Sequence, residues 1–326
     1  MIIKNPALLK KFLFVVKIVI TIVSIIYIIR KIISENIIHN IFYNIQLIKE
    51  DHFKLGIIFF VFTAMIVNWL VEAYKWKFLI SKLEHISLGK SLKSVLIGLS
   101  IGIVTPSRIG EFSGKVFILD KADRKSAFII SMISSFSQFF ATIFFGFFGL
   151  IYFVHRFKII DNQFVIVLLV SMTIILFLLI FLIYNISYFE NRTINNTLMK
   201  RGVKYFQIFF SFKTKEVFRA LFLSCIRFVI FTTQFWALFF LFDISLNFTE
   251  AFLLISLSYL ILTIVPTIAL ADIGIRGTIV LYFIGFISAN QSGILSASIL
   301  LWFINLAFPA FIGAFFIYQL KLFRNK

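Results

Sequence analysis

The stretch that decides the fold is 92–119, which reads LKSVLIGLSIGIVTPSRIGEFSGKVFIL. It begins like a membrane-crossing apolar run, but Pro106 and Gly110 interrupt it beside the charges of Arg108 and Glu111. Proline and glycine end a helix, and a helix end at membrane depth is tolerated only where protein or a wet cavity satisfies the freed backbone groups. The stretch therefore predicts a broken hairpin inside a membrane protein.

A second apolar stretch, 251–287, is broken in the same manner. Its interruption runs from Pro266 to Arg276 and includes Asp272 and Gly274. Two such breaks in one chain predict two hairpins whose tips contain both charge and freed backbone.

The composition of the whole chain agrees with a membrane protein. Of its 326 residues, 61% are hydrophobic and 14% charged, with a mean hydropathy of +1.02. So few charges cannot cover a water-facing surface. The net charge is +18, and the basic residues that produce it alternate with apolar runs. This pattern argues against a nucleic-acid partner and favours contact with an anionic membrane face. We expect Cys225, the single cysteine, to be a packed apolar side chain rather than a reactive thiol.

Six further apolar runs are long enough to cross a membrane. They are 12–29, 55–71, 126–154, 164–184, 217–242 and 294–318. The predicted fold is all-α: a polytopic membrane bundle of six full spans plus two re-entrant broken hairpins, forming a single domain over 1–326.

Lys and Arg predict the orientation, because they are retained on the cytoplasmic side. Basic residues concentrate in 72–93 and 185–219, so we expect these segments and both termini to be cytoplasmic, in a bacterial inner membrane. Tyr74, Trp76 and the nearby lysines are interpreted as an interfacial belt after the second span.

This orientation predicts an inverted-topology repeat. The halves 1–157 and 158–326 both run span, span, broken hairpin, span, with their hairpins entering from opposite faces. In secondary transporters such repeats place the substrate site near the midplane. Two unrelated proline breaks in an ordinary bundle are the alternative.

The charged residues at the breaks are the candidate substrate-binding site. Arg108 and Glu111 are three residues apart, and Asp272 and Arg276 are four apart. An arginine can hold a lipid phosphate by two hydrogen bonds while an acid orients it, reads a cationic headgroup or carries a proton. The alternative is two local ion pairs that only compensate each other. Arg227, midway along its apolar run, is a further candidate that can also pair or snorkel.

The sequence contains few catalytic signatures. There is no Walker loop, no G-x-S-x-G and no H-E-x-x-H, so we expect no cofactor, no metal and no ATP hydrolysis. Transport would then run downhill, use an ion gradient or need a partner.

Three motifs resemble the lysylphosphatidylglycerol synthase transmembrane, or flippase-like, family. They are an aromatic-basic segment at 72–80, a P-x-R-x-G-E motif at 106–111 and a later proline followed by a glycine-rich turn at 266–277. The third departs from the family pattern, because Ala271 and Asp272 replace glycines and Gly277 replaces a glutamate. An acidic role there is expected to have moved to Asp272.

The resemblance implies translocation of an anionic phospholipid or a lipid-linked sugar, with a possible partner enzyme that supplies the lipid. Some members carry a soluble aminoacyl-transfer domain, and we expect the membrane half alone here. Two alternatives remain: a membrane-embedded transferase or accessory subunit that uses Glu111 or Asp272 as a base, and an envelope scaffold.

Overall fold

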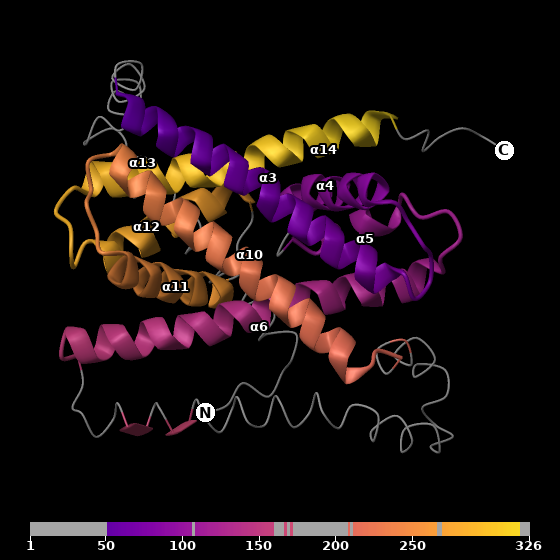
Figure 1. Cartoon of the computed structure of the whole chain (residues 1–326), viewed down its shortest axis with the longest axis horizontal. Helices are drawn as coiled ribbons and strands as arrows, with labels where there is room; N and C mark the ends of the chain where they lie inside the picture. Colours follow the sequence, from indigo (N-terminus) through magenta and orange to yellow (C-terminus); the bar gives the residue numbers. More distant parts are fainter. Residues whose placement is uncertain are drawn as a thin grey trace, which may run out of the picture.

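The computed structural model is helical wherever it assigns regular structure. The structure describes residues 51–105, 108–159, 166–167, 170–171, 208, 211–265 and 269–319. The principal elements in this part of the chain are α3 (His52–Ile80), α4 (Leu88–Val104), α5 (Gly110–Val116), α6 (Arg124–Arg156), α10 (Thr214–Leu241), α11 (Phe248–Ile264), α12 (Ala269–Ile284), α13 (Gln291–Trp302), the π-helix η3 (Phe303–Ala307) and α14 (Phe308–Gln319) (Figure 1). The predicted all-α class is confirmed for these residues.

Four helices are long and apolar enough to cross a membrane. They are α3, α6, α10 and the continuous helix Gln291–Gln319. These match the predicted spans 55–71, 126–154, 217–242 and 294–318. The predicted span 12–29 lies outside the described residues, and so does nearly all of 164–184, so the total of six spans stays a prediction.

The first long helix, α3, extends nine residues beyond its predicted end. It begins at the cap residue Asp51, whose carboxylate accepts hydrogen bonds from the backbone N–H groups of Phe53 (2.8 Å) and Lys54 (3.3 Å). Its last turns are buried: Trp76 is inaccessible, and its Nε1 donates to Ser94 Oγ at 2.9 Å. The predicted interfacial belt is therefore wrong for Trp76, because α4 packs over that face of α3.

The first broken hairpin consists of α4 and α5, which run antiparallel and in close contact. A Cβ atom on Gly114 would lie 2.6 Å from the Cα atom of Gly98, so only glycine allows this approach. At the tip, the Gly110 N–H donates to Thr105 Oγ1 at 2.9 Å and closes the turn. Pro106, the predicted helix breaker, lies outside the described residues.

The second broken hairpin consists of α11 and α12. Tyr259, near the end of α11, lies beside Arg276 of α12, with the guanidinium carbon 5.7 Å from the ring centre. This hairpin packs on α6, where a Cβ atom on Gly149 would meet the Leu253 carbonyl and one on Gly146 would lie 2.5 Å from the Leu260 Cβ. Pro266 is also outside the described residues.

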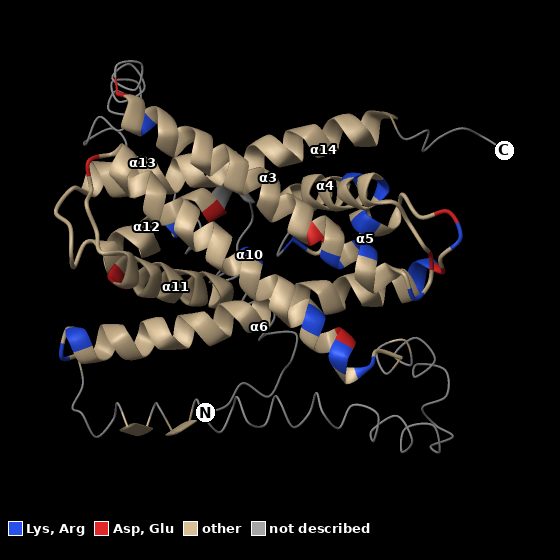
Figure 2. Cartoon of the chain, in the orientation of Figure 1, with Lys and Arg blue, Asp and Glu red and all other residues tan. Residues whose placement is uncertain are grey.

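The hairpins enter the bundle from opposite ends (Figure 1). At the start of α3, Lys54 pairs with Asp243, just before the second hairpin, at 3.0 Å. Beyond the end of α3, Glu84 accepts hydrogen bonds from the backbone at 120–122, just after the first hairpin. Basic residues gather at the end of the bundle where α3 ends and α6 and α10 begin (Figure 2). This arrangement is compatible with the inverted repeat, but the halves 1–157 and 158–326 stay a prediction.

The last long helix contains a π-turn, η3, between α13 and α14. After this turn, α14 packs on α4: Ser100 Oγ donates to the Ala310 carbonyl at 2.5 Å, and Gly313 lies against the Leu96 backbone. The π-turn lies where the long helix passes the tips of the two hairpins.

Candidate functional site

A cavity of about 660 Å³ lies among the long helices and is lined by residues from both hairpins. All five predicted substrate-binding residues line it: Arg108, Glu111, Arg227, Asp272 and Arg276. These residues are distant in sequence: four belong to the two hairpins and Arg227 belongs to α10, and the packing of the bundle brings them around one space. The volume falls within the range of small-molecule sites in proteins.

The local ion pairs considered from the sequence are also present. Arg108 Nη2 lies 3.4 Å from Glu111 Oε2, and Arg276 Nη2 lies 3.1 Å from Asp272 Oδ2. Arg108 has a φ of 56°, a left-handed conformation that is uncommon for a residue with a side chain. The local ion pairs thus occur beside a shared cavity. The interpretation as compensating ion pairs and the interpretation as a substrate-binding site are therefore compatible.

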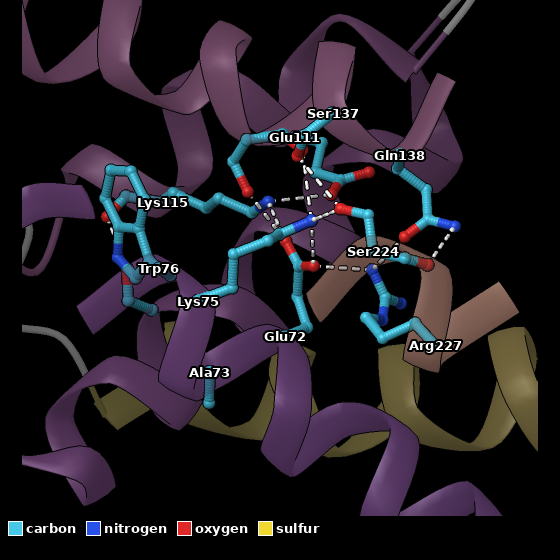
Figure 3. Close-up of polar contacts among 12 residues, drawn as sticks. Glu72, Ala73, Lys75, Trp76, Glu111, Lys115, Ser137, Gln138, Ser224 and Arg227 are labelled. Atoms are coloured by element: carbon cyan, nitrogen blue, oxygen red, sulfur yellow. Dashed lines mark hydrogen bonds and ion pairs between the residues drawn. The ribbon is translucent and has the colours of Figure 1, made fainter. Parts of the chain in front are cut away.

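The centre of the charged network is Glu72 of α3, which the sequence analysis did not select. Its Oε2 lies 2.9 Å from Lys75 Nζ and 2.5 Å from Arg227 Nη1, and its Oε1 lies 3.0 Å from Lys115 Nζ (Figure 3). Ser134 of α6 also donates to Oε1, at 3.2 Å. One carboxylate, 3% exposed, therefore receives three cations from three helices.

Lys75 and Lys115 are fully buried members of this network. The pair of Lys115 with Glu72 joins the first hairpin to α3, and Lys115 also lies 3.0 Å from Glu111 of its own helix. Lys75 donates to the Ser134 carbonyl at 3.0 Å and to Ser224 Oγ at 3.1 Å. Lys75 belongs to the basic segment 72–93 that is predicted to be cytoplasmic, and the side of the membrane stays a prediction. Helix packing buries both lysines against carboxylates.

Arg227 pairs inside the protein rather than extending to the surface. Its Nε donates to Asn68 Oδ1 at 2.9 Å, and its Nη1 donates to Gln138 Oε1 at 3.3 Å as well as to Glu72. Its guanidinium carbon lies 5.5 Å from the Trp69 ring centre. Arg227 retains 15% side-chain exposure and lines the cavity, whereas Lys75 and Lys115 have none.

Several buried donors around the cavity have no hydrogen-bond partner in the part of the chain that the structure describes. Trp69 Nε1, Arg108 Nε and Arg276 Nε lack a hydrogen bond to any described residue. All three residues line the cavity. A buried donor left unsatisfied costs about 1–3 kcal/mol, so such groups indicate a wet cavity or a ligand that accepts hydrogen bonds.

Cations exceed carboxylates in the described lining. Four cationic side chains face three carboxylates: Lys75, Arg108, Arg227 and Arg276 against Glu72, Glu111 and Asp272. Lys115, directly behind Glu72, adds another positive charge. In a medium of low dielectric, this excess attracts an anion.

Of the four residues predicted to shape the two breaks, the structure describes Gly110 and Gly274. A Cβ atom on Gly110 would lie 2.7 Å from Thr105 Oγ1, so a glycine is required there. Gly274 lies within α12, and its carbonyl accepts a hydrogen bond from Thr278 Oγ1 at 3.0 Å.

One sequence signal could have revealed Glu72. Asn68, Glu72 and Lys75 recur at spacings of four and three residues, which places them on one face of a helix that continues past 71. Hydropathy alone ends the span before Glu72, the first charged residue, and so leaves this face out of the membrane part of the protein.

Comparisons with known proteins give one family match. The model of the family described as lysylphosphatidylglycerol synthase TM region matches residues 13–313. A search of the curated proteins found no match. The match includes every residue of the charged network and both hairpins.

Proposed function

The chain belongs to the lysylphosphatidylglycerol synthase TM region family, and we propose that it is a flippase-like transporter that moves a phospholipid or lipid-linked headgroup across the membrane. The family match and the four long apolar helices make it a multi-pass membrane protein. The proposal adds a substrate class and a site: an anionic headgroup in the cavity between the hairpin tips.

The observation that carries this proposal is the combination of excess cations and unpaired donors around one cavity. Trp69, Arg108 and Arg276 each present a donor that no described residue satisfies. A phosphate supplies negative charge and several acceptor oxygens, so it would compensate both features. Two independent properties of the lining, charge and hydrogen bonding, thus favour the same ligand group.

The network around Glu72 would allow Arg227 to exchange partners. When Arg227 turns from Glu72 to a phosphate, the carboxylate still has Lys75 and Lys115 within 3.0 Å. Glu72 is then never left as an uncompensated buried charge, which would be strongly destabilising. Arg227 is therefore the cation of this network best able to bind and release a headgroup.

The distribution of basic residues supports an orientation for the transporter. We place the basic end of the bundle, where α6 and α10 begin, at the cytoplasmic face of a bacterial inner membrane, with both termini cytoplasmic (Figure 2). The first hairpin would then enter from the cytoplasm and the second from outside. A partner enzyme could supply the lipid on the cytoplasmic side.

The alternative of a transferase has less support from the geometry. Glu111 lies 3.0 Å from Lys115, and Asp272 lies 3.1 Å from Arg276. A reaction that used either carboxylate as a base would first have to break its ion pair. The cavity is better suited to bind an anion than to remove a proton.

A flux assay tests the proposal. The purified protein is placed in phosphatidylcholine vesicles with a trace of acyl-labelled phosphatidylglycerol, and movement between leaflets is followed by quenching of the outer label. We expect Arg276→Gln and Arg227→Gln each to slow this movement about tenfold or more, because each removes charge-assisted hydrogen bonds to phosphate.

Arg219→Gln is the matched control. Arg219 is on the same helix as Arg227, but it packs on the rings of Tyr74 and Phe78 and does not line the cavity. This variant should retain wild-type flux. Wild-type flux in both cavity variants would contradict the proposed site, and no flux by the wild-type protein would contradict the transporter function.

A further inference from the structure

The π-turn η3 places one unusual polar residue, Asn305, at the cavity. The turn spans Phe303–Ala307, and Asn305 is at its centre. The residue is 2% exposed and lines the cavity together with Leu306. π-turns are rare within helices and are frequent at functional sites.

The hydrogen bonding of Asn305 is incomplete in a specific manner. Its Nδ2 donates to the Leu301 carbonyl at 3.4 Å, within the same helix. Its Oδ1 accepts no hydrogen bond from the part of the chain that the structure describes. A buried acceptor without a donor costs about 1–3 kcal/mol, so its retention requires a compensating partner.

This acceptor contrasts with the unpaired donors of the same cavity. Trp69, Arg108 and Arg276 present N–H groups that suit a phosphate, whereas Asn305 Oδ1 suits an O–H or N–H group. A phosphate ester that lacks a second polar group would leave the acceptor unsatisfied. A ligand with both groups would satisfy the two sides of the lining together.

We propose that Asn305 is a specificity-determining residue that accepts a hydrogen bond from a hydroxyl or ammonium group of the headgroup beyond the phosphate. This inference rests on the proposed transport function. It narrows the substrate class to phosphate esters whose headgroup carries a hydrogen-bond donor, such as glycerol, ethanolamine or a sugar, and it disfavours simple alkyl phosphodiesters.

The test compares two lipids with the same charge. Acyl-labelled phosphatidylglycerol and phosphatidylmethanol are both singly negative phosphodiesters, but only the first has headgroup hydroxyls. In phosphatidylcholine vesicles, the wild-type protein should move phosphatidylglycerol about tenfold faster, the equivalent of one unsatisfied hydrogen bond. In Asn305→Leu this preference should fall to near one, because phosphatidylglycerol slows while phosphatidylmethanol keeps its rate.

A second lipid pair distinguishes the two kinds of donor. Phosphatidylethanolamine has ammonium N–H groups and phosphatidylcholine has none. A preference within this pair that Asn305→Leu removes would identify ammonium as the bound donor, and a preference only within the first pair would identify hydroxyl. The inference is overturned if the wild-type protein shows no preference in either pair.

Two further measurements separate this inference from its alternatives. If Asn305 only stabilises the π-turn through Leu301, Asn305→Leu and the smaller Asn305→Ala should slow every lipid equally and lower the unfolding temperature, which would overturn the inference. Arg276→Gln should slow both members of each pair equally. Loss of preference in the Asn305 variants with intact dependence on Arg276 supports the inference. Flux that is independent of Arg276 would instead reject the proposed site.

Discussion

The two broken hairpins have similar sequence breaks but are stabilised by different means. The first hairpin closes on itself through Gly98 and Gly114, and its second limb carries two charges of a buried network. The second hairpin packs on α6 through Gly149, and its one described ion pair joins Asp272 to Arg276. A proline break therefore predicts where a helix ends, but not what supports the resulting tip.

This difference suggests a division of roles. The first hairpin is tied to α3 through Glu72 and Lys115, both almost fully buried, and so provides a fixed wall of the cavity. Arg276, on the second hairpin, has one carboxylate partner and an unpaired Nε among the described residues. We expect the second hairpin to respond more readily to a bound headgroup.

The largest effect should come from removing the central carboxylate of the first hairpin's network. Glu72→Gln leaves three buried cations without their shared counter-charge, and breaking such a network costs about 3–5 kcal/mol. Asp272→Asn removes the counter-charge of one cation, so its loss should be smaller. Thermal unfolding in detergent, followed by tryptophan fluorescence, measures both.

Glu250→Gln is a suitable control for these two variants. Glu250 is on α11 and is partly exposed, with Arg156 at 3.8 Å, and its Oε1 accepts a hydrogen bond from Tyr152 at 2.7 Å that a glutamine oxygen can also accept. Such an exposed pair contributes little, and this variant should unfold close to the wild-type temperature. Equal shifts for Glu72→Gln and Asp272→Asn would remove the distinction between the hairpins.

A smaller effect should come from enlarging the glycine contact of the first hairpin. Gly114→Ala places a methyl group 2.6 Å from the Gly98 backbone, and such overpacking costs about 1–3 kcal/mol. Gly56→Ala in α3 is the matched control, because no atom lies within 4 Å of its new Cβ. That control should stabilise α3 slightly. If Gly114→Ala unfolds no earlier than Gly56→Ala, the two limbs are not held by close contact.

The smallest effect concerns the base of each hairpin, the place where its two limbs join the rest of the bundle, because the two bases differ in their response to pH. At the base of the first hairpin, Glu84 forms the connecting hydrogen bonds. Burial raises the pKa of this carboxyl, but hydrogen bonds from the backbone at 120–122 and from Lys90 outweigh burial and lower the pKa from 4.5 to about 2. The second is tied by a neutral amide: Asn290 Nδ2 donates to the Phe242 carbonyl at 3.0 Å.

Glu84 therefore stabilises the first base fully above pH 4.5, and this contribution is lost as the pH falls towards 2. Hydrogen exchange at 120–122, corrected for the intrinsic rate at each pH, should show less protection at pH 2 than at pH 5. Exchange near Asn290 should change less. In Glu84→Gln the protection at 120–122 should be low at both pH values; a pH response that survives in this variant would show that another group titrates.

Hydropathy and helix breakers predicted a large part of this architecture from the sequence. Apolar length located α3, α6, α10 and the last long helix, because membrane spans have a narrow length range. The breaks at 106–111 and 266–276 identified arginines and acids that line one cavity. A charged side chain within an apolar run costs free energy in a membrane, so these residues could be selected from the sequence as candidates for a site.

Residues whose role depends on tertiary packing could not be identified from the sequence. Glu72 and Lys75 follow an apolar run and look like the end of a span until residues of α5, α6 and α10 contact them. Lys115 lies in a short polar segment, and only the close contact of α4 and α5 buries it. Asn305 gave no signal, because a single amide in an apolar helix is commonly structural and its π-turn is not evident from local sequence.

The π-turn also lets the last helix hold one residue more than an unbroken α-helix of the same length. A π-turn contains one residue more than an α-turn, and each residue of an α-helix advances the chain by about 100° around the axis. Without the turn, the extra residue would rotate α14 by that angle relative to α13 and move Gly313 away from the Leu96 backbone. The turn absorbs this residue, so the helix widens at the cavity while α14 keeps its contact with α4.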